Sequence, residues 1–362
     1  MKISFFGSSL VSSYWNGAAT YYRGMLCALA GLGHRISFYE PNAFERQSHR
    51  DMADPNWARV IVYPATSDGW QSSLEAAARG SDILVKASGV GVFDRELETA
   101  LADIASPALR IYWDVDAPAT LDQIGSDPAH HLRAAIPQYD LVFTYGGGDP
   151  VVDAYLAAGA RECVPIYNAL DPAHHRPVEP FAEFSSDLSF LGNRLPDREA
   201  RVETFFLDAA RRLPHRRFLL GGSGWDSKDV PPNVTRVGHV GTSAHNAFFC
   251  SGLATLNVNR ESMARYGFSP PTRVFEAVGA GACLITDKWQ GIEHFLEPDS
   301  EVLVAADGEE VAKHLDSLTP SRAQSIAARA RKRILAHHTY AHRALQVHRV
   351  LQGASPQVGA AE

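Results

Sequence analysis

The chain has few cysteines and no long hydrophobic run. Its four cysteines, Cys27, Cys163, Cys250 and Cys283, do not form the CxxC spacing of a zinc or redox site. Each stands singly in an apolar stretch, which predicts a buried, reduced thiol. The first residues, MKISFFGSSLVSS, lack the apolar core of a signal peptide, and no later run reaches membrane-spanning length. We therefore expect a cytoplasmic protein.

The chain also lacks an excess of positive charge. Its 34 Lys and Arg residues face 41 Asp and Glu residues, which gives a formal net charge of -7. This balance argues against a nucleic-acid partner and favours small molecules or proteins. With 362 residues, of which 45% are hydrophobic and 21% charged, the chain is long enough for two domains with a core each.

Common dinucleotide and metal motifs are missing as well. The segment after Gly7 lacks GxGxxG, because serines stand at positions 9 and 12, and this disfavours a nicotinamide-dependent oxidoreductase. The histidine pairs at 130–131, 174–175 and 337–338 have no carboxylate at metal-ligand spacing, and we expect them to be solvated or core residues. We expect neither a bound metal nor a cofactor.

The chain does contain a long alternation of short β-rich runs and helical stretches. Strands are predicted at 2–6, 35–40, 59–63, 82–87, 109–114, 140–145 and 162–167, and then at 187–192, 216–222, 234–240, 253–258, 282–287 and 301–306. Such alternation predicts an α/β protein of βαβ units with two parallel sheets covered by helices. Ligands in open α/β folds bind at the carboxyl ends of the strands, so we expect two Rossmann-like domains that face a cleft.

Domain boundaries follow from where this alternation lapses. We predict a first domain at 1–170, a polar linker rich in proline and histidine at 171–186 and a second domain at 187–318. Helices should fill 319–352, with Thr319 as N-cap and Pro320 as the first helical residue. The tail at 353–362 is expected to be disordered.

The stretch GFSPPTRVFEAVGAG, residues 267–281, predicts an anion site. Ser269 is expected as the N-cap of a helix and Pro270 as its first residue, which leaves the amides of Thr272 and Arg273 as free donors at the positive end. Glu276 shares their helix face and could accept hydrogen bonds from sugar hydroxyls. The alternative is an ordinary exposed pair between Arg273 and Glu276.

Other strand ends in the second half add weaker candidates. In NRLPDRE, residues 193–199, Arg194 and Arg198 suit a diphosphate, unless they pair with Asp197 and Glu199 in a solvated loop. The glycines of LLGGSGWD and NVTRVGHV allow close backbone approach to a ligand, although ordinary turns would look the same. The binding residues predicted there are Gly222, Gly238 and His239.

Two loops of the first half carry the other candidates. After the first strand, Tyr14 and Trp15 could stack on a sugar face or only hold the next helix, and Asn16–Gly17 could offer backbone N–H groups. In YWDVDAPAT, residues 112–120, we assign Asp114 and Asp116 as catalytic candidates, with Asp116 first, as a general base or acceptor-orienting group. Metal binding by the DxD pattern and simple turn capping are the alternatives.

Three segments resemble a known family. SPPTRVFEAVGAGACLITDKWQGIEHFLEPDSEVLVA (269–305), LSFLGNRLPDREARVETFF (188–206) and SSYWNGAATYYRGML (12–26) resemble GT-B-fold glycosyltransferases with a group 1 C-terminal domain, most closely the CgeB-like, spore-maturation-type branch. The resemblance implies transfer of a sugar, such as a hexose, from a nucleotide diphosphate sugar bound in the C-terminal domain. The acceptor, a glycan, protein or small molecule, would bind mainly in the N-terminal domain.

By position, the resemblance makes Glu276 the ribose ligand, Arg273 and the Thr272 region the diphosphate ligands, and Gly238–His239 the base contact. One departure concerns Phe268, which stands where related retaining enzymes carry a second glutamate, so this motif does not support a retaining mechanism. A nucleotide-sugar epimerase on the same fold and a catalytically inactive nucleotide-sugar-binding protein remain alternatives. The basic face of the last helices leaves peripheral membrane contact open.

Overall fold

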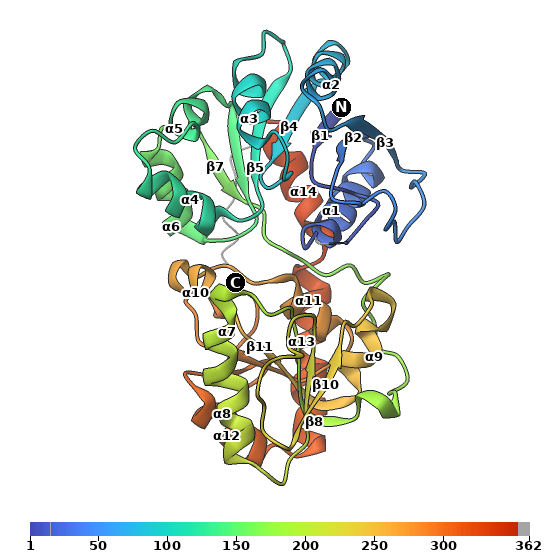
Figure 1. Cartoon of the computed structure of the whole chain (residues 1–362), viewed down its shortest axis with the longest axis vertical. Helices are drawn as coiled ribbons and strands as arrows, with labels where there is room; N and C mark the ends of the chain where they lie inside the picture. Colours follow the sequence, from blue (N-terminus) through green and yellow to red (C-terminus); the bar gives the residue numbers. More distant parts are fainter. Residues whose placement is uncertain (15, 354–362) are drawn as a thin grey trace. The chain divides into compact units, whose positions relative to one another are not determined.

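The computed structural model describes residues 1–14 and 16–353. They form two compact units, one of Met1–Tyr167 with the helix that starts at Tyr340, the other of Asn168–Thr339. Each unit is built on one parallel sheet flanked by helices (Figure 1). The predicted side-chain role of Trp15 and the predicted disorder of 354–362 lie outside the described residues.

The first unit contains a seven-stranded sheet in the order β3-β2-β1-β4-β5-β6-β7. All its neighbouring strands are parallel, with Ile3 of β1 paired to Ile36 on one side and Ile83 on the other. The central strands β1 and β4 are almost entirely buried because helices cover both faces, and even the polar Ser4 and Lys86 on them are buried. The strands are β1 Lys2–Phe6, β2 Arg35–Asn42, β3 Ala58–Pro64, β4 Ile83–Ala87, β5 Leu109–Asp114, β6 Leu141–Thr144 and β7 Cys163–Pro165.

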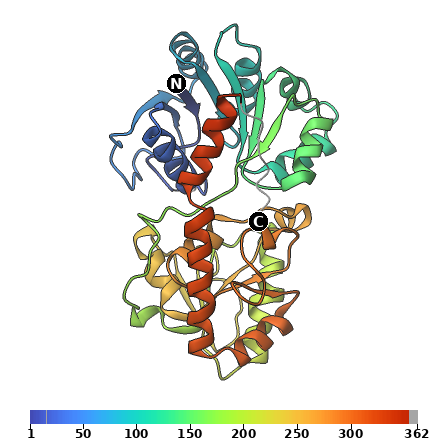
Figure 2. The same ribbon diagram turned by 180° about the vertical axis from the view of Figure 1, so that it is seen from behind.

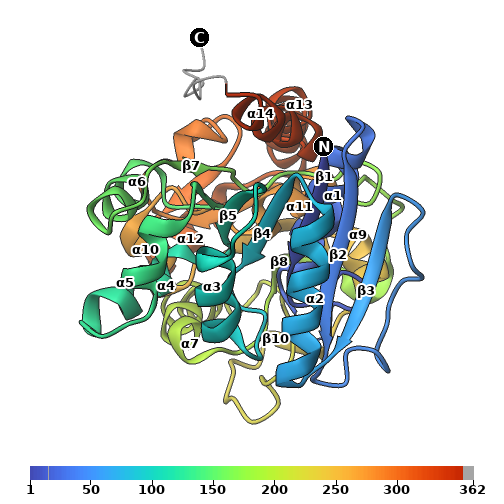
Figure 3. The ribbon, with the colours of Figure 1, turned by 90° about the horizontal axis from the view of Figure 1, so that it is seen from above.

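Helices connect these strands and flank the first sheet. They are α1 Ala19–Gly31, α2 Ser67–Gly80, α3 Asp94–Asp103, α4 Ala117–Ser126, α5 Leu132–Ala135, α6 Gly148–Ala157 and the returning helix α14 Tyr340–Leu351. Helix α14 packs beside α1, and Figure 2 shows it in red in front of the first sheet. The view in Figure 3 places α2 and α3 on the side of the sheet away from α14.

The second unit contains a six-stranded parallel sheet in the order β10-β9-β8-β11-β12-β13. Its strands are β8 Ser186–Leu191, β9 Phe218–Gly221, β10 Val234–Gly238, β11 Gly252–Asn257, β12 Leu284–Asp287 and β13 Leu303–Ala305. Buried residues of these strands, such as Phe190, Leu220, Leu256 and Ile285, form one hydrophobic core with the flanking helices.

The helices of the second unit pack in two groups. Helix α7 Pro196–Val202 continues through a π-helical turn, Glu203–Leu207, into α8 Asp208–Arg212, and α8 packs against α12 Gly308–Ser317. Helix α11 Thr272–Gly279 packs against α9 His245–Cys250 and α13 Pro320–His337, and α10 spans Glu261–Tyr266. No helix in the described ranges is long and apolar enough to cross a bilayer.

The division into units differs from the predicted boundaries at both ends of the second unit. The segment expected as a linker at 171–186 belongs to the second unit, because Leu170 N donates to His338 O at 2.8 Å and the chain then runs along α11. The expected C-terminal helices divide between the units. Helix α13 stays with the second unit and α14 joins the first, where Gly24 of α1 lets the Tyr340 ring approach closely.

All thirteen predicted strands are present, with each end within two residues of its expected position. Thr319 is the N-cap of α13 and accepts from Arg322 N, with Pro320 as first helical residue, as predicted. All four cysteines are free, but the expectation of buried thiols holds only for Cys163 and Cys283, since Cys250 is partly exposed and Cys27 is exposed. Cys27 lies on α1 at a position that faces away from the sheet.

Candidate functional site

The carboxyl edge of the second sheet gathers most of the candidates in that unit. Gly192 follows β8, Gly222 follows β9, and Gly238, Asn257 and Asp287 end β10, β11 and β12. Since all six strands are parallel, these ends meet at one edge. Gly222 has φ 118°, and a side chain there would lie 2.2 Å from Gly192 O, so only glycine lets these two loops approach.

Helix α11 begins at this edge, two residues later than the N-cap predicted at Ser269 would place it. Pro271 is the N-cap, with φ -69° and ψ 159°, and Thr272 is the first helical residue. The prediction failed because Ser269 and Pro270 both precede a proline, which pushes them out of the helical region. Ser269 is buried and its hydroxyl donates to Gly267 O at 2.8 Å.

The later start keeps the predicted donors at the first turn. Val274 N donates back to Pro271 O at 3.0 Å, whereas among the described residues the amides of Thr272 and Arg273 have no hydrogen-bond acceptor. These two N–H groups lie at the positive end of the helix dipole. The first turn of α11 can therefore bind an anion.

The Arg273 side chain returns to the end of β8. Its Nη1 donates to Asn257 Oδ1 at 2.9 Å, and its guanidinium carbon lies 5.2 Å from the centroid of the Phe190 ring. A Cβ on Gly192 would stand 2.9 Å from Arg273 Nη2 and 3.2 Å from Arg198 Nη1. Two guanidinium groups therefore converge on Gly192, where the chain has no side chain.

The electrostatics of Arg273 reflect this convergence. Burial and, to a smaller extent, the neighbouring Arg198 lower the pKa of its guanidinium to about 9, against the opposing effect of Glu276 and Asp287. A lowered arginine pKa means that the neighbouring groups do not fully offset the cost of burying the charged guanidinium. An anion bound between Arg273 and Arg198 would supply it.

A buried polar network fixes the position of Arg273. Asn257 Nδ2 donates to Asn259 Oδ1 at 2.9 Å and to Thr286 Oγ1 at 3.0 Å, so its Oδ1 remains directed at Arg273. Asn259 N donates in turn to Asp287 at 3.2 Å. Sequence reasoning missed this network, although NVN at the end of β11 and TD at the end of β12 are polar residues at buried strand ends.

Asp287 is the anionic end of that network. Its carboxylate is fully buried and accepts from Arg201 Nη2 at 2.7 Å. Burial raises its pKa, while Arg201 and the hydrogen bonds from Asn259 and Thr286 oppose the rise. The ion pair with Arg201 thus compensates the buried negative charge of Asp287 at the edge of the site.

The two arginines predicted together in the loop after β8 have different environments. Arg194 forms a two-point ion pair with Glu199, and both N–O distances are 2.8 Å. Pairing with Glu199 is the alternative to diphosphate binding that the sequence left open for this arginine. Asp197 pairs with Arg260. Arg198 Nη1 donates to Asn193 O at 3.1 Å and lies beside Arg273 at Gly192.

The loop at Gly238 and Glu276 differ in their exposure. Gly238 has φ 65° with open space around it, and His239 is exposed beside it. Glu276 is buried, with 8% of its surface exposed, and among the described residues it forms no ion pair with Arg273. The exposed Arg–Glu pair considered from the sequence is therefore absent, and the Glu276 carboxylate instead lies near His175 and His245.

Phe268 has an unusual backbone. Its φ is 44°, a left-handed value that is rare for an aromatic residue, and its N–H donates to Gln290 O at 2.6 Å. Its ring packs on Gly291, where a side chain would stand 2.2 Å away, and against His294 at 5.3 Å between centroids. The neighbours therefore hold Phe268 in a strained conformation just before the two prolines.

In the first unit, Asp114 and Asp116 end β5 with different surroundings. Asp114 is fully buried and accepts hydrogen bonds from Ser88 Oγ, Asp116 N and Tyr155 Oη at 2.7, 2.9 and 2.5 Å. Burial raises the pKa of its carboxyl. Asp116 is half-buried at the N-cap of α4, with no side-chain capping bond. Asp114 thus positions the turn that presents Asp116.

The loop after β1 holds the remaining first-unit candidates. Asn16 is buried, and its Nδ2 donates to Ser9 O at 2.8 Å and Ser12 O at 3.0 Å, so its side chain orders the loop. Gly17 has open space around it. The partly exposed Tyr14 ring stacks on His49 at 4.0 Å between centroids. Of this group, Tyr14 and Gly17 present accessible surface.

Comparisons with known proteins agree with this architecture. Solved structures similar over nearly the whole chain include sucrose-phosphate synthase from Thermosynechococcus elongatus, with TM-score 0.71, 15% identity and 98% of each chain covered. Anabaena HepE in complex with UDP-glucose has TM-score 0.68 and 15% identity and covers 98% of this chain and 100% of its own. The chain has the GT-B fold.

Other comparisons concern the family. An α-glucosyltransferase in complex with UDP-glucose and DNA also shares the GT-B fold, with TM-score 0.70 and 12% identity over 97% of this chain and 99% of that one. A family model described as glycosyl transferase-like matches residues 198–349, which include Arg198, Arg273 and Glu276. No curated protein matches the chain.

Proposed function

We propose that the protein is a glycosyltransferase that transfers a sugar from a nucleotide diphosphate sugar to an acceptor. The observation that carries the proposal is the convergence of Arg198 and Arg273 on Gly192, beside the free amides of the first turn of α11. The match of residues 198–349 to a glycosyl transferase-like family model supports it independently. The resemblance to the CgeB-like branch belongs to the same proposal.

The diphosphate of the donor would bind between the two guanidiniums and the amides of Thr272 and Arg273. A guanidinium gives paired, charge-assisted hydrogen bonds to phosphate oxygens, and the helix N-terminus adds backbone donors. As the bond to the sugar breaks, negative charge grows on the departing diphosphate, and fixed positive groups stabilise it. This arrangement supplies the role that a metal ion has in other phosphate sites, and we propose no cofactor.

Glu276 would accept hydrogen bonds from the ribose hydroxyls. It lies one helical turn beyond Arg273, and its buried carboxylate is not neutralised by that arginine. The loop at Gly238 and His239, which has open space and an exposed ring, would contact the base. Several of the similar GT-B structures hold UDP or UDP-glucose, so uridine nucleotides are the first donors to test.

The first unit would contribute the acceptor side. Asp116 would orient or deprotonate the acceptor hydroxyl, held in place by the buried Asp114, while Tyr14 and Gly17 would contact the acceptor. An Asp116→Asn variant should bind the donor normally and lose transfer. Normal turnover by that variant would remove Asp116 from the mechanism.

The decisive experiment measures nucleotide recognition. Thermal shifts and calorimetry with UDP, GDP, ADP and their sugars should identify one nucleotide that stabilises the protein, since a ligand at about a hundred times its Kd adds roughly 2.7 kcal/mol. Affinity for that diphosphate and for its 2′-deoxy form is then compared in wild type and Glu276→Gln. We expect the preference for the ribose form to shrink in the variant. If no nucleotide binds, the donor site is refuted.

Two enzymatic alternatives and one non-enzymatic alternative give different results. A nicotinamide-dependent oxidoreductase would consume NAD(P)H, and an epimerase would interconvert nucleotide sugars without an acceptor. An inactive binding protein would bind the donor and neither hydrolyse nor transfer its sugar. Product analysis of a donor incubation with and without candidate acceptors separates these outcomes.

A further inference from the structure

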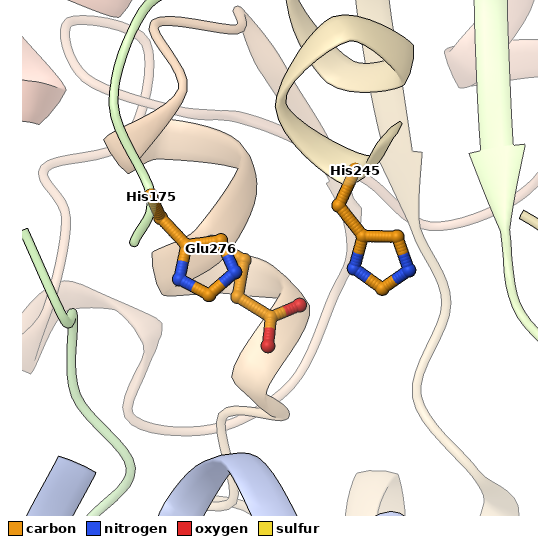
Figure 4. A group of neighbouring side chains, drawn as sticks. All are labelled: His175, His245 and Glu276. Carbon is orange, nitrogen blue, oxygen red and sulfur yellow. The ribbon is translucent and has the colours of Figure 1, made fainter. Parts of the chain in front are cut away.

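Three side chains in the second unit surround one point next to α11. His175, His245 and Glu276 each offer a metal-ligating atom, and these atoms all lie within 4.8 Å of one another. Figure 4 shows the Glu276 carboxylate between the two imidazole rings. In the described part of the chain none of the three side chains hydrogen-bonds another. The cluster is therefore a set of ligands around a gap and not an internal hydrogen-bond network.

The His245 imidazole is oriented as a metal ligand would be. Its Nε2 lies 3.2 Å from Val240 O and donates to that carbonyl, and within the described residues its Nδ1 is buried without a hydrogen-bond partner. A carbonyl that accepts a hydrogen bond from one ring N–H leaves the lone pair of the other ring nitrogen for an ion. Burial lowers the pKa of this imidazole, with His175 and Arg273 acting in the same direction and Glu276 and the bond to Val240 O opposing them.

His175 is held beside Glu276 by two features of the fold. Gly279 lies one turn after Glu276 on α11, and a Cβ there would stand 3.0 Å from His175 O and 3.3 Å from its Cβ. The absence of a side chain at 279 thus lets the His175 segment lie on the helix. In addition, Asn246 Nδ2 donates to His174 O at 2.7 Å. That bond joins the residue after His245 to the residue before His175.

The composition of the cluster selects a class of ion. Two imidazoles and one carboxylate are the ligands of open zinc sites, in which a fourth position is left for water or another ligand. Calcium and magnesium prefer sets made of oxygen ligands. Zinc bonds of about 2.0–2.2 Å would place the ligand atoms about 3.3 Å apart. Since the atoms now lie within 4.8 Å of one another, binding would draw them together by at most about 1.5 Å.

We propose that His175, His245 and Glu276 bind one Zn²⁺-type divalent ion. The site goes beyond the donor chemistry, and it shares Glu276 with the proposed ribose contact. If the proposed donor site is correct, the ion and the ribose compete for the same carboxylate. The ion would then act as an inhibitor of nucleotide binding, with no part in sugar transfer.

The metal site is tested directly on the untagged full chain. Calorimetry with ZnCl₂ should give one ion per chain, and Co²⁺ should give the visible absorption of a tetrahedral site with nitrogen and oxygen ligands. His175→Gln, His245→Gln and Glu276→Gln should each weaken Zn²⁺ binding at least about tenfold. The matched control is His215→Gln, which removes an exposed histidine of the same unit and should bind as wild type does. The absence of the Co²⁺ spectrum in wild type, or equal Zn²⁺ affinity in all variants, would overturn the proposal.

A second measurement separates the metal site from the donor site. UDP affinity is measured with and without Zn²⁺ in wild type and in His245→Gln, which keeps Glu276 but loses a metal ligand. Chelation of Zn²⁺ by UDP in solution affects both proteins equally, so a loss of affinity confined to wild type supports competition at Glu276. Zn²⁺ binding with no effect on UDP would support the metal site and refute the ribose role of Glu276.

Discussion

The guanidinium of Arg273 lies over the ring of Phe190, 5.2 Å from its centroid, while its Nη1 is held by Asn257. The aromatic face and the amide oxygen fix the plane of the side chain without neutralising its charge. Arg273 is thus positioned before any ligand binds, so binding does not have to pay the conformational entropy of ordering its side chain.

Replacing Arg273 by lysine should weaken binding of the donor diphosphate. The charge remains, but the planar, two-point contact with phosphate and the stacking on Phe190 are lost. We expect Kd to rise by about tenfold or more, equivalent to about 1.4 kcal/mol, in calorimetry with UDP. Arg217→Lys, an exposed arginine at the amino end of β9, is the matched control and should leave Kd unchanged.

A methyl group at Gly192 should displace both guanidiniums. The new Cβ would stand 2.9 Å from Arg273 Nη2, and the backbone at Gly192 does not need a left-handed φ, so the Gly192→Ala chain should fold. Weaker UDP binding with a nearly unchanged melting temperature is the expected result. Gly241→Ala, with open space around its Cβ, serves as control. Unchanged affinity in Gly192→Ala would show that the guanidiniums do not meet the ligand there.

Arg198 and Arg194 should differ in their effects. Arg198→Gln removes a charge beside Arg273, whereas Arg194→Gln removes a charge that Glu199 already pairs. We expect the first to raise Kd for the diphosphate several-fold more than the second. Titrations at two salt concentrations check this, because a phosphate contact also makes binding more sensitive to ionic strength. The reverse ranking would place the diphosphate nearer Glu199.

The first unit should lose local stability in acid through Asp94. Burial alone would raise the pKa of Asp94, but the buried Lys86, 2.8 Å away, and the amides of Val90 and Gly91 lower it overall. A lowered pKa stabilises the fold above the ordinary value of about 3.9, and this contribution is lost as pH falls through the lowered value.

Hydrogen exchange of peptides from α3 measures this effect. Between pH 6 and pH 3 protection of the wild type should fall, and Asp94→Asn should already be less protected at pH 6 and change less with acid. Asp103→Asn, an exposed carboxylate at the end of the same helix, should follow wild type. Identical pH dependence of Asp94→Asn and wild type would exclude Asp94 as the source.

The strands and the start of helix α11 could be predicted from the sequence because their signals are local. Apolar runs fix the strands, and SPPTR fixes a helix start whose first free donors are Thr272 and Arg273, even though the N-cap moved from Ser269 to Pro271. The residues that hold Arg273 were missed because Asn257 and Asp287 lie on different strands. Only the order of the strands in the sheet shows that these two strand ends are neighbours.

The histidine cluster could not be predicted from the sequence either, because its residues meet only in the folded chain. His175 and His245 come from segments seventy residues apart, and neither has a carboxylate at motif spacing. They meet because Gly279 admits one segment and Asn246 ties it to the other. Similarly, the domain boundary depends on the packing of α14 beside α1, which no composition change in the chain marks.

The pairing of Leu170 with Thr339 has a consequence for how the protein can be divided. The chain enters the second unit and leaves it at neighbouring points, so this unit has the topology of an insertion whose two ends meet. A chain trimmed to residues 168–339 would retain Arg198, Arg273 and the whole histidine cluster. Nucleotide and zinc recognition could then be studied in a fragment of less than half the size, independently of any acceptor.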